Sequence, residues 1–331
     1  MEVNATSPIS IDAEQARQAS AELTILGAGA WGTALAKVVE KNDHTVCLWS
    51  RRSETSMAEA VKDSHVILSA VSMKGVPSVA AQLKELNIPP ETIIVTATKG
   101  LDPETTRTPS QIFHDTFPQN PIVVLSGPNL SKEIEQGLPA ATVAASSHPE
   151  AAEAVQYLFS SDIFRVYRSP DPLGAELGGT LKNIVAIAVG VCEGLDLGSN
   201  ARSALMTRAL PEMIRIGTHL GGQAETFVGL SGLGDMLATC TSVLSRNYRV
   251  GYGLAQGKSL EQILDEIGST AEGVNTTNVL MQIANREGIP APISREVYRL
   301  LNGKISALQA VEALMERDLK AEACLLTEST P

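Results

Sequence analysis

The chain has 331 residues, of which 44% are hydrophobic, and a formal net charge of −11 at pH 7. This length and apolar content suffice for a sizeable core, and the length alone predicts two domains. The negative charge creates no basic field that would concentrate a polyanion, which argues against a nucleic acid or an anionic membrane surface as the main partner.

Residues 1–20 are predicted to form a flexible polar tail, because they lack the basic start and apolar centre of a secretion signal. No uninterrupted run of 18 apolar residues follows, so stable membrane insertion is not expected. The cysteines form no CxxC or Cys/His cluster, which argues against a disulfide framework and a zinc site; they are Cys47, Cys192, Cys240 and Cys324. These features predict a cytoplasmic protein without a bound metal.

From residue 22 to about 168, short β-rich runs alternate with helical stretches. Several of these runs are apolar throughout, which is typical of strands that helices cover on both faces. The pattern predicts an α/β domain over residues 21–168, with a Rossmann-like, doubly wound and mostly parallel sheet. The predicted strands are Leu23–Leu26, Thr45–Trp49, His65–Ala70, Thr92–Thr96, Ile122–Leu125, Ala141–Ala145 and Ile163–Tyr167.

The first strand leads directly into a GxGxxG motif formed by Gly27, Gly29 and Gly32, at a predicted helix start that includes Ala30 and Trp31. Glycines there permit a tight turn, close approach to a pyrophosphate and close packing of helix on strand. The N–H groups at the helix start then bind the anion. The motif predicts dinucleotide binding rather than a ligand-free turn, while Trp31 has two interpretations, covering the cofactor or packing against the sheet.

Arg51 and Arg52 follow the second strand, where NAD-specific domains usually carry an acidic residue that binds the ribose 2′-hydroxyl. Guanidinium groups suit a 2′-phosphate, so the sequence favours NADPH over NADH. The alternative is a solvated surface pair without a ligand.

Polar residues also follow two later strands: Lys99 ends one, and after the next a turn at Gly127 leads to Asn129 and Ser131. The carboxyl ends of strands in open α/β sheets face the ligand crevice, so these groups are expected beside the cofactor. The alternatives are a surface lysine whose head reaches solvent and a plain helix cap at Asn129 or Ser131.

After residues 168–174, RSPDPLG, the β-rich runs stop. Apolar residues then recur at three- and four-residue intervals, as at Leu181, Ile184, Val185 and Ala188. This spacing predicts an all-α C-terminal domain over residues 169–331, with the boundary in the proline-bearing connection.

Two charged residues stand alone in apolar stretches of this second part. Lys182 carries the one charge between Leu177 and Cys192, and Asp235 the one charge in residues 226–245. Burial penalises the charged form of lysine and brings its proton affinity toward neutrality, which suits general acid/base catalysis. The alternatives are a structural ion pair for Lys182, and for Asp235 a helix N-cap or a pair with a lysine.

Ser245, Arg246 and Asn247 lie at another predicted helix start. A planar bidentate donor flanked by neutral donors suits a phosphate group. The alternative is a solvated helix start without a ligand.

Seven motifs occur in one order: GAGAWGTALA, TATKGL, SGPN, LKNIVAIAVG, GLSGLGD, SRN and AEGVNT. In order and separation this set resembles the NAD(P)-dependent glycerol-3-phosphate dehydrogenases of the bacterial type, from residue 22 to about 316. The resemblance implies reversible hydride transfer between NAD(P)H and dihydroxyacetone phosphate, which gives sn-glycerol 3-phosphate for phospholipid synthesis.

The resemblance also implies roles for single residues. Lys182 would be the general acid/base at the reacting oxygen, and Lys99 would lie near both substrate and cofactor. The other implied substrate-site residues are Gly127, Asn129, Asp235, Ser245, Arg246 and Asn247, and the implied cofactor contacts outside the glycine loop include Ser131, Arg246 and Glu272.

Three features depart from the family pattern: residues 50–64 form a short connection, GPN stands where many members have Gly-Pro-Thr, and VSMKG replaces VPS.

A β-hydroxyacid dehydrogenase and a ketopantoate reductase share the two-domain plan and stay open as alternatives. A non-catalytic NADP sensor is a third, although it would not need all the polar residues above. A homodimer is expected, because it is the commonest soluble oligomer.

Overall fold

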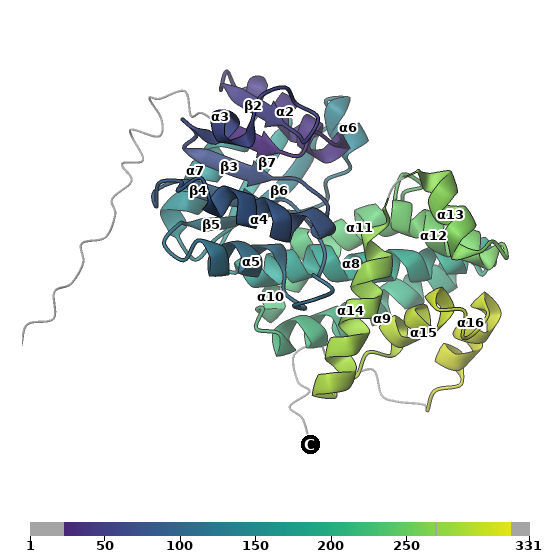
Figure 1. Ribbon diagram of the computed structural model, residues 1–331. Helices are drawn as coiled ribbons and strands as arrows, with labels where there is room; N and C mark the ends of the chain where they lie inside the picture. Colours follow the sequence, from purple (N-terminus) through teal and green to yellow (C-terminus); the bar gives the residue numbers. More distant parts are fainter. Residues whose placement is uncertain (1–22, 269, 319–331) are drawn as a thin grey trace, which may run out of the picture.

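A computed structural model describes residues 23–268 and 270–318, and the predicted tail and Cys324 lie outside this range. Strands and helices alternate up to Ser169, and from Pro172 onward the described elements are helical. The predicted fold class is therefore confirmed. We refer to residues 23–169 as the α/β half and to residues 172–318 as the helical half; Figure 1 shows the two packed side by side. The division into two domains at residue 169 stays a prediction.

Seven strands form one sheet in the order β2-β1-β3-β4-β5-β6-β7. The strands β1 to β5 are parallel, β6 runs antiparallel to β5, and β7 is parallel to β6. Each predicted run forms a strand, and β1, β3, β4 and β5 are buried along their whole length between the layers of helices. The strands are β1 (Leu23–Leu26), β2 (Val46–Trp49), β3 (Val66–Ser69), β4 (Ile93–Thr96), β5 (Ile122–Ser126), β6 (Ala140–Ala145) and β7 (Phe164–Ser169).

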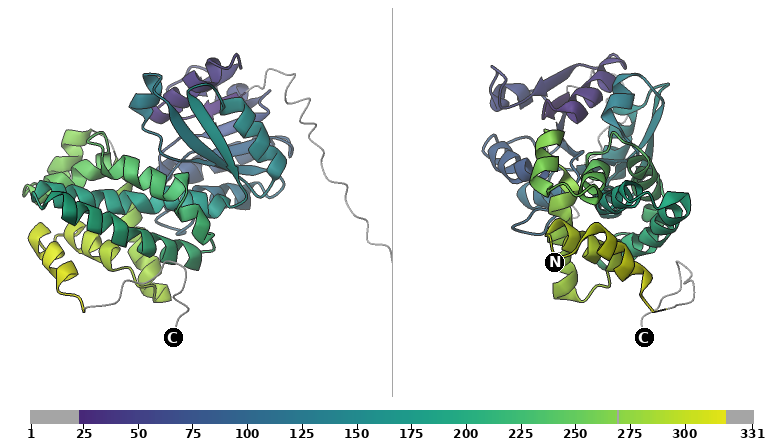
Figure 2. Two further views of the ribbon diagram at one scale, coloured as in Figure 1. Left: turned by 180° about the vertical axis from the view of Figure 1, so that it is seen from behind. Right: turned by 90° about the vertical axis from the view of Figure 1, so that its right-hand side faces the viewer.

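Helices cover both faces of this sheet (Figure 2). One face packs against α2 (Ala30–Glu40), α6 (Ser131–Glu135) and α7 (Pro149–Phe159). The other packs against α3 (Met57–Val61), the 3₁₀ turn η1 (Met73–Gly75), α4 (Val76–Lys84) and α5 (Pro109–Thr116). The chain passes from β1 to β2 and then to β3 on the opposite side of β1, so a topological switch point lies at the glycine loop.

Helix α8 (Pro172–Gly194) is the centre of the helical half, and it is buried from Gly174 to Cys192. Among the described residues it is the one helix long and apolar enough to cross a membrane, but its whole apolar window is buried inside the protein. The surrounding elements are α9 (Gly198–His219), α10 (Ala224–Phe227), the π-helical turn η2 (Leu230–Gly234), α11 (Asp235–Cys240), α12 (Arg246–Ala255), α13 (Leu260–Ile267), α14 (Glu272–Glu287), α15 (Pro292–Leu301) and α16 (Ala307–Met315).

Helix α12 lies directly against α8 because glycines remove the side chains between them. A Cβ atom at Gly251 would lie 1.9 Å from the carbonyl oxygen of Ile187, and one at Gly190 would lie 2.1 Å from that of Tyr248. This close approach fixes where α12 begins, and hence the position of Arg246, relative to α8.

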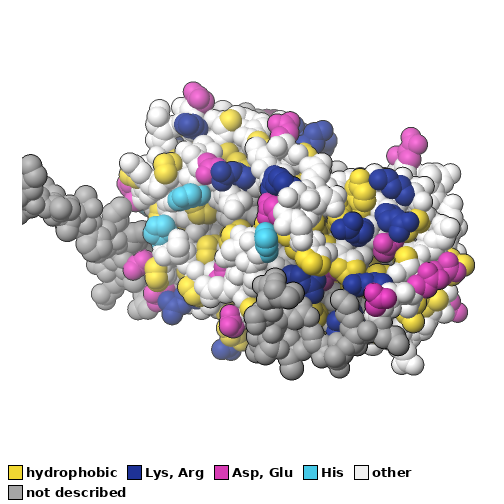
Figure 3. Space-filling view, turned by 90° about the horizontal axis from the view of Figure 1, so that it is seen from below, with side chains coloured by type: hydrophobic (Ala, Val, Ile, Leu, Met, Phe, Trp, Pro, Cys, Tyr) yellow, Lys and Arg dark blue, Asp and Glu magenta, His cyan; other side chains and the backbone are white. Residues whose placement is uncertain are grey.

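The surface carries charges of both signs. On the face in Figure 3, Lys and Arg side chains lie among Asp and Glu side chains, with hydrophobic groups scattered between them.

Candidate active site

The glycine loop leaves open space at the start of α2. Gly27 has a φ of +121°, and a Cβ atom there would lie 2.9 Å from the backbone of Ala70. A Cβ atom at Gly32 would lie 1.9 Å from the Gly27 carbonyl oxygen, whereas one at Gly29 would have no neighbour within 4 Å. Gly29 is the N-cap of α2 and provides no side-chain cap. These features fit a bound pyrophosphate, because an anion can approach the N–H groups at the helix start without a steric barrier.

Trp31 lies on the first turn of α2 and packs against the core of the α/β half. Its indole N–H donates a 3.2 Å hydrogen bond to the carbonyl oxygen of Ala97, just after β4. This contact supports the packing interpretation of Trp31 and ties the glycine-loop helix to the strand that carries Lys99.

Arg51 and Arg52 lie in the exposed turn after β2. Neither guanidinium forms an ion pair within the described part of the chain. Because β2 neighbours β1, both residues lie at the same sheet edge as the glycine loop, where a 2′-phosphate could be bound.

Two lysines from different halves of the molecule bind one buried carboxylate. Lys99 Nζ lies 2.5 Å from Oδ2 of Asp235, and Lys182 Nζ lies 3.0 Å from Oδ1. The exposed fractions of the side chains are 3% for Asp235, 9% for Lys182 and 19% for Lys99. Asp235 is therefore paired with lysines, and its N-cap interpretation is wrong, because Gly234 is the N-cap of α11 and Asp235 is its first helical residue.

Thr239 completes this cluster and was not found from the sequence. Its hydroxyl donates to Oδ1 of Asp235 at 3.2 Å and accepts from Lys182 Nζ at 2.5 Å. Thr239 lies four residues after Asp235 in α11, so both side chains face the same way. That spacing is the one sequence signal that could have identified it.

Burial lowers the pKa of Lys182 from its ordinary value of 10.5 to about 8. The Asp235 carboxylate opposes this shift, and the nearby Lys99 ammonium adds to it. Burial also raises the pKa of the neighbouring Cys240 thiol to about 12. Cys240 is therefore a neutral thiol at physiological pH, while the pKa of Lys182 lies about one unit above neutrality.

Two glycines allow the Lys99 side chain to reach Asp235: Gly179 leaves space for it, and the Gly127 backbone binds its ammonium group. A Cβ atom at Gly179 on α8 would lie 2.6 Å from Ser126 Oγ and 3.1 Å from Lys99 Cε, so a side chain there would displace the lysine. The carbonyl oxygen of Gly127 accepts a 3.2 Å hydrogen bond from Lys99 Nζ. Gly127 thus joins the lysine cluster through its backbone.

Asn129 and Ser131 lie near this edge of the sheet, but hydrogen bonds to the cluster are not among their described contacts. The Asn129 amide donates to the Ala141 carbonyl oxygen at 3.1 Å and accepts from the Thr142 hydroxyl at 2.9 Å. Ser131 is the first residue of α6. Asn129 therefore fixes the turn after β5 against β6.

The SRN segment forms the start of α12, as both interpretations of the sequence predicted, but Ser245 and Asn247 are buried rather than solvated. Ser245 is the N-cap and its hydroxyl accepts from the Tyr248 N–H at 3.2 Å. The buried Asn247 amide donates to Asn183 Oδ1 at 2.9 Å and accepts from the Gly273 N–H at 3.0 Å. Asn183 follows Lys182 directly, so Asn247 couples α12 and α14 to the lysine helix.

Glu272 begins α14 and contacts the α/β half. Its carboxylate accepts a 3.4 Å hydrogen bond from the Met73 N–H, after β3. Burial raises the pKa of Glu272, while the hydrogen bond from Met73 and the charge of Arg246 oppose that rise. Arg246 and Glu272 therefore lie close enough to interact, near the loop that borders Gly27.

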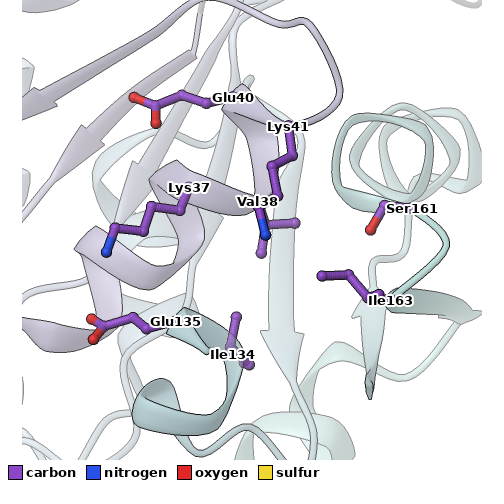
Figure 4. Close-up of a pocket in the computed structure, with 8 residues that line it drawn as sticks. All are labelled: Lys37, Val38, Glu40, Lys41, Ile134, Glu135, Ser161 and Ile163. Atoms are coloured by element: carbon purple, nitrogen blue, oxygen red, sulfur yellow. The ribbon is translucent and has the colours of Figure 1, made fainter. Parts of the chain in front are cut away.

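A cavity of about 230 Å³ lies elsewhere, between the C-terminal part of α2, α6 and the segment before β7 (Figure 4). Lys37, Val38, Ile134 and Ile163 are among its lining residues, and none of the predicted site residues lines it. It lies at the opposite end of α2 from the glycine loop, so it has no direct part in the site.

Comparison with known proteins places these features in a family context. A family model described as "NAD-dependent glycerol-3-phosphate dehydrogenase C-terminus" matches residues 171–312. The corresponding model of the N-terminus matches residues 22–57 and 52–152.

Full-length relatives are similar over most of the chain. A protein named glycerol-3-phosphate dehydrogenase (NAD(P)+) from Acaryochloris marina is 67% identical over 302 residues, which cover 91% of this chain and 97% of the relative. A protein of the same name from Synechocystis is 66% identical over 301 residues, covering 91% and 95%. The crystal structure of glycerol-3-phosphate dehydrogenase from Coxiella burnetii is 34% identical, has a TM-score of 0.86 and covers 90% of this chain and 99% of that one.

Proposed function

Because the chain belongs to the NAD(P)-dependent glycerol-3-phosphate dehydrogenase family, we propose that Lys182 is the general acid/base of its reaction. The enzyme uses NAD(P) and interconverts dihydroxyacetone phosphate and sn-glycerol 3-phosphate. Membership in this family sets aside the hydroxyacid dehydrogenase, the ketopantoate reductase and the non-catalytic sensor. The observation that carries the role of Lys182 is its burial beside Asp235 with a pKa of about 8.

When bound, the nicotinamide supplies a hydride to the substrate carbonyl carbon and takes it back in the reverse reaction. In the reduction, Lys182 Nζ gives a proton to the carbonyl oxygen, which becomes the C2 hydroxyl. In the oxidation, neutral Lys182 removes that proton. A pKa near 8 suits both directions, because the ammonium is the main form at neutral pH yet releases its proton readily.

Asp235 orients this lysine and balances its charge. One carboxylate oxygen faces Lys182 and the other faces Lys99. In our proposal Lys99, the more exposed of the two lysines, binds the substrate next to the cofactor and stabilises negative charge that develops on the carbonyl oxygen. Asp235 would thereby keep both ammonium groups at one point in space.

The remaining substrate contacts would bind the phosphate group of the substrate. We propose that Arg246 binds it as a bidentate donor at the start of α12, with help from Ser245 and Asn247. The Ser245 and Asn247 side chains already make helix-cap and interhelical hydrogen bonds, so their main contribution is to hold Arg246 in place. Gly127 and Asn129 would line the side of the substrate site that faces Arg246.

The cofactor would bind along the glycine loop, with its pyrophosphate at the N–H groups of Ala30, Trp31 and Gly32. Arg51 and Arg52 favour NADPH, because two exposed guanidinium groups at this position suit a 2′-phosphate. Ser131, Arg246, Lys99 and Glu272 would contact the nicotinamide end.

We further propose that the enzyme is a cytoplasmic homodimer that supplies sn-glycerol 3-phosphate to phospholipid synthesis. The test of the function as a whole is a steady-state assay with dihydroxyacetone phosphate and each of NADPH and NADH. Cofactor oxidation that depends on this substrate, and not on ketopantoate or a hydroxyacid, is the expected result. No such oxidation with either cofactor would refute the proposal.

A further inference from the structure

A buried glutamate on the lysine helix forms hydrogen bonds with the α/β half. Glu176 of α8 is 1% exposed. Its carboxylate accepts the Ser110 N–H at 2.9 and 3.3 Å and the Ser110 hydroxyl at 2.5 Å, at the start of α5. Burial raises the pKa of Glu176 to about 7, and the hydrogen bonds from Ser110 and Thr108 oppose that rise. The proposed chemistry above leaves this group without a role.

The contact of Glu176 lies at one end of a segment that begins beside Lys99. At the other end, the Gly100 N–H donates a 3.0 Å hydrogen bond to the hydroxyl of Thr180. Thr180 lies four residues after Glu176, so both side chains project from one face of α8. Helix α8 therefore holds residues 100–110 at both ends, and Lys182 follows two residues after Thr180.

We propose that Glu176 is a positioning residue for the dehydrogenase reaction. By holding the start of α5 on α8, it fixes residues 100–110, and thereby the adjoining Lys99, relative to Lys182 across the two halves of the molecule. The inference rests on the proposed function, because it assumes that both lysines act on the substrate. Its effect follows from geometry, since displacing a reacting group by about 1 Å can cost on the order of a hundredfold in rate.

The chain contains a matched control for this role. Glu212 of α9 is also buried, at 5% exposure, and burial raises its pKa. Its carboxylate accepts the Ile293 N–H, the Ser294 N–H and the Ser294 hydroxyl at 2.7–2.8 Å, at the start of α15. All these groups lie within the helical half. Glu212 thus binds the start of a helix in the same way as Glu176, but it does not link Lys99 to Lys182.

The experiment compares kcat and KM of the pairs Glu176→Leu with Glu212→Leu and Glu176→Gln with Glu212→Gln. Assays use NADPH and dihydroxyacetone phosphate at pH 8, where Glu176 is mostly ionised. We expect Glu176→Leu to lower kcat by about tenfold or more with KM for dihydroxyacetone phosphate changed by less than about threefold. Glu176→Gln should restore most of kcat, because its amide oxygen accepts the Ser110 N–H and its amide donates to the Ser110 hydroxyl.

The Glu212 variants should lose thermal stability but keep kcat per folded molecule within about twofold. Wild-type kcat in folded Glu176→Leu, or an equal loss of kcat in Glu212→Leu, would overturn the proposal. If a leucine variant does not fold, Ser110→Ala and Ser294→Ala replace the pair. Then only Ser110→Ala should lower kcat, by about threefold or more, and a wild-type kcat there would equally overturn the proposal.

Lys182→Ala separates this proposal from the proposed function. Full turnover in Lys182→Ala would mean that the assigned catalytic role has failed. Loss of turnover in Lys182→Ala together with normal kcat in Glu176→Leu would remove the positioning role alone.

Discussion

Lys99 and Lys182 share the two oxygens of one carboxylate, although one lysine follows a strand of the sheet and the other lies in the central helix of the helical half. The Nζ atoms lie 2.5 and 3.0 Å from Oδ2 and Oδ1 of Asp235. The Lys99 ammonium repels that of Lys182 and, together with burial, lowers the pKa of Lys182 to about 8. Lys182 therefore holds a proton that it can release more readily than an ordinary lysine, at the junction of the two halves.

Replacing Lys182 by alanine should lower kcat by at least about a hundredfold, because the reacting oxygen would lose its proton donor. The measurement is steady-state oxidation of NADPH with dihydroxyacetone phosphate. Lys258→Ala is the control, since Lys258 pairs with Glu266 at the surface. Near-normal turnover in a folded Lys182→Ala enzyme would exclude the catalytic role.

The pH dependence of the two directions should be opposite. Reduction needs the Lys182 ammonium, so its kcat/KM should fall as pH rises through about 8. Oxidation needs the neutral amine, so its kcat/KM should rise through the same region. The check is a pair of pH profiles from the same preparation; a reduction rate that stays flat well above pH 8 would contradict the assignment.

In Asp235→Asn, the fall of kcat/KM for reduction should occur at lower pH than in the wild-type enzyme. The Asp235 charge raises the pKa of Lys182, and the amide lacks that charge. We also expect a lower kcat, since both lysines lose their shared partner. Asp171→Asn is a suitable control: Asp171 is a buried carboxylate that accepts hydrogen bonds from Gly174 and Gln223. If kcat/KM for reduction falls at the same pH in Asp235→Asn as in the wild-type enzyme, Asp235 does not set the pKa of Lys182.

Gly29→Val should fold normally but bind the cofactor poorly. A Cβ atom there meets nothing within 4 Å, and the φ and ψ of Gly29 are extended and open to valine. The side chain would occupy the space assigned to the pyrophosphate, so KM for NADPH should rise by about tenfold or more. Gly32→Ala should instead lower the melting temperature, because its Cβ atom would lie 1.9 Å from the Gly27 carbonyl oxygen. An unchanged KM in Gly29→Val would place the pyrophosphate elsewhere.

Arg246→Ala should chiefly raise KM for dihydroxyacetone phosphate, because phosphate binding is nearly equal in the ground and transition states. Arg249→Ala provides the comparison, as an exposed arginine one turn later on the same helix. If both variants keep the wild-type KM, Arg246 does not bind the phosphate.

Replacing Arg51 and Arg52 together by alanine should raise KM for NADPH by about tenfold or more and leave KM for NADH nearly unchanged, since only NADPH carries the 2′-phosphate. Arg286→Ala, on a distant surface of α14, controls for general charge effects. A strong preference for NADH in the wild-type enzyme would refute the NADPH assignment.

Local patterns in the sequence were sufficient for the strands, for the helical class of the second part and for part of the site. Short β-rich runs predicted all seven strands, and several of these runs are apolar throughout because a strand covered on both faces displays no polar side. The glycine spacing marked the loop after β1, and isolation in apolar surroundings identified Lys182 and Asp235. Each of these signals lies within one short segment of chain.

Contacts between segments were decided only by the tertiary structure. Lys99 and Asp235 are 136 residues apart, so no local spacing could show that they pair or that Lys182 shares the same carboxylate. Thr239 and Glu176 carried no mark of their own, since a threonine or a glutamate in a helix is ordinary until packing buries it. The sequence alone determined which side chains were costly to bury, whereas the fold decided which of them share one site, because burial and ion pairing depend on distances between remote parts of the chain.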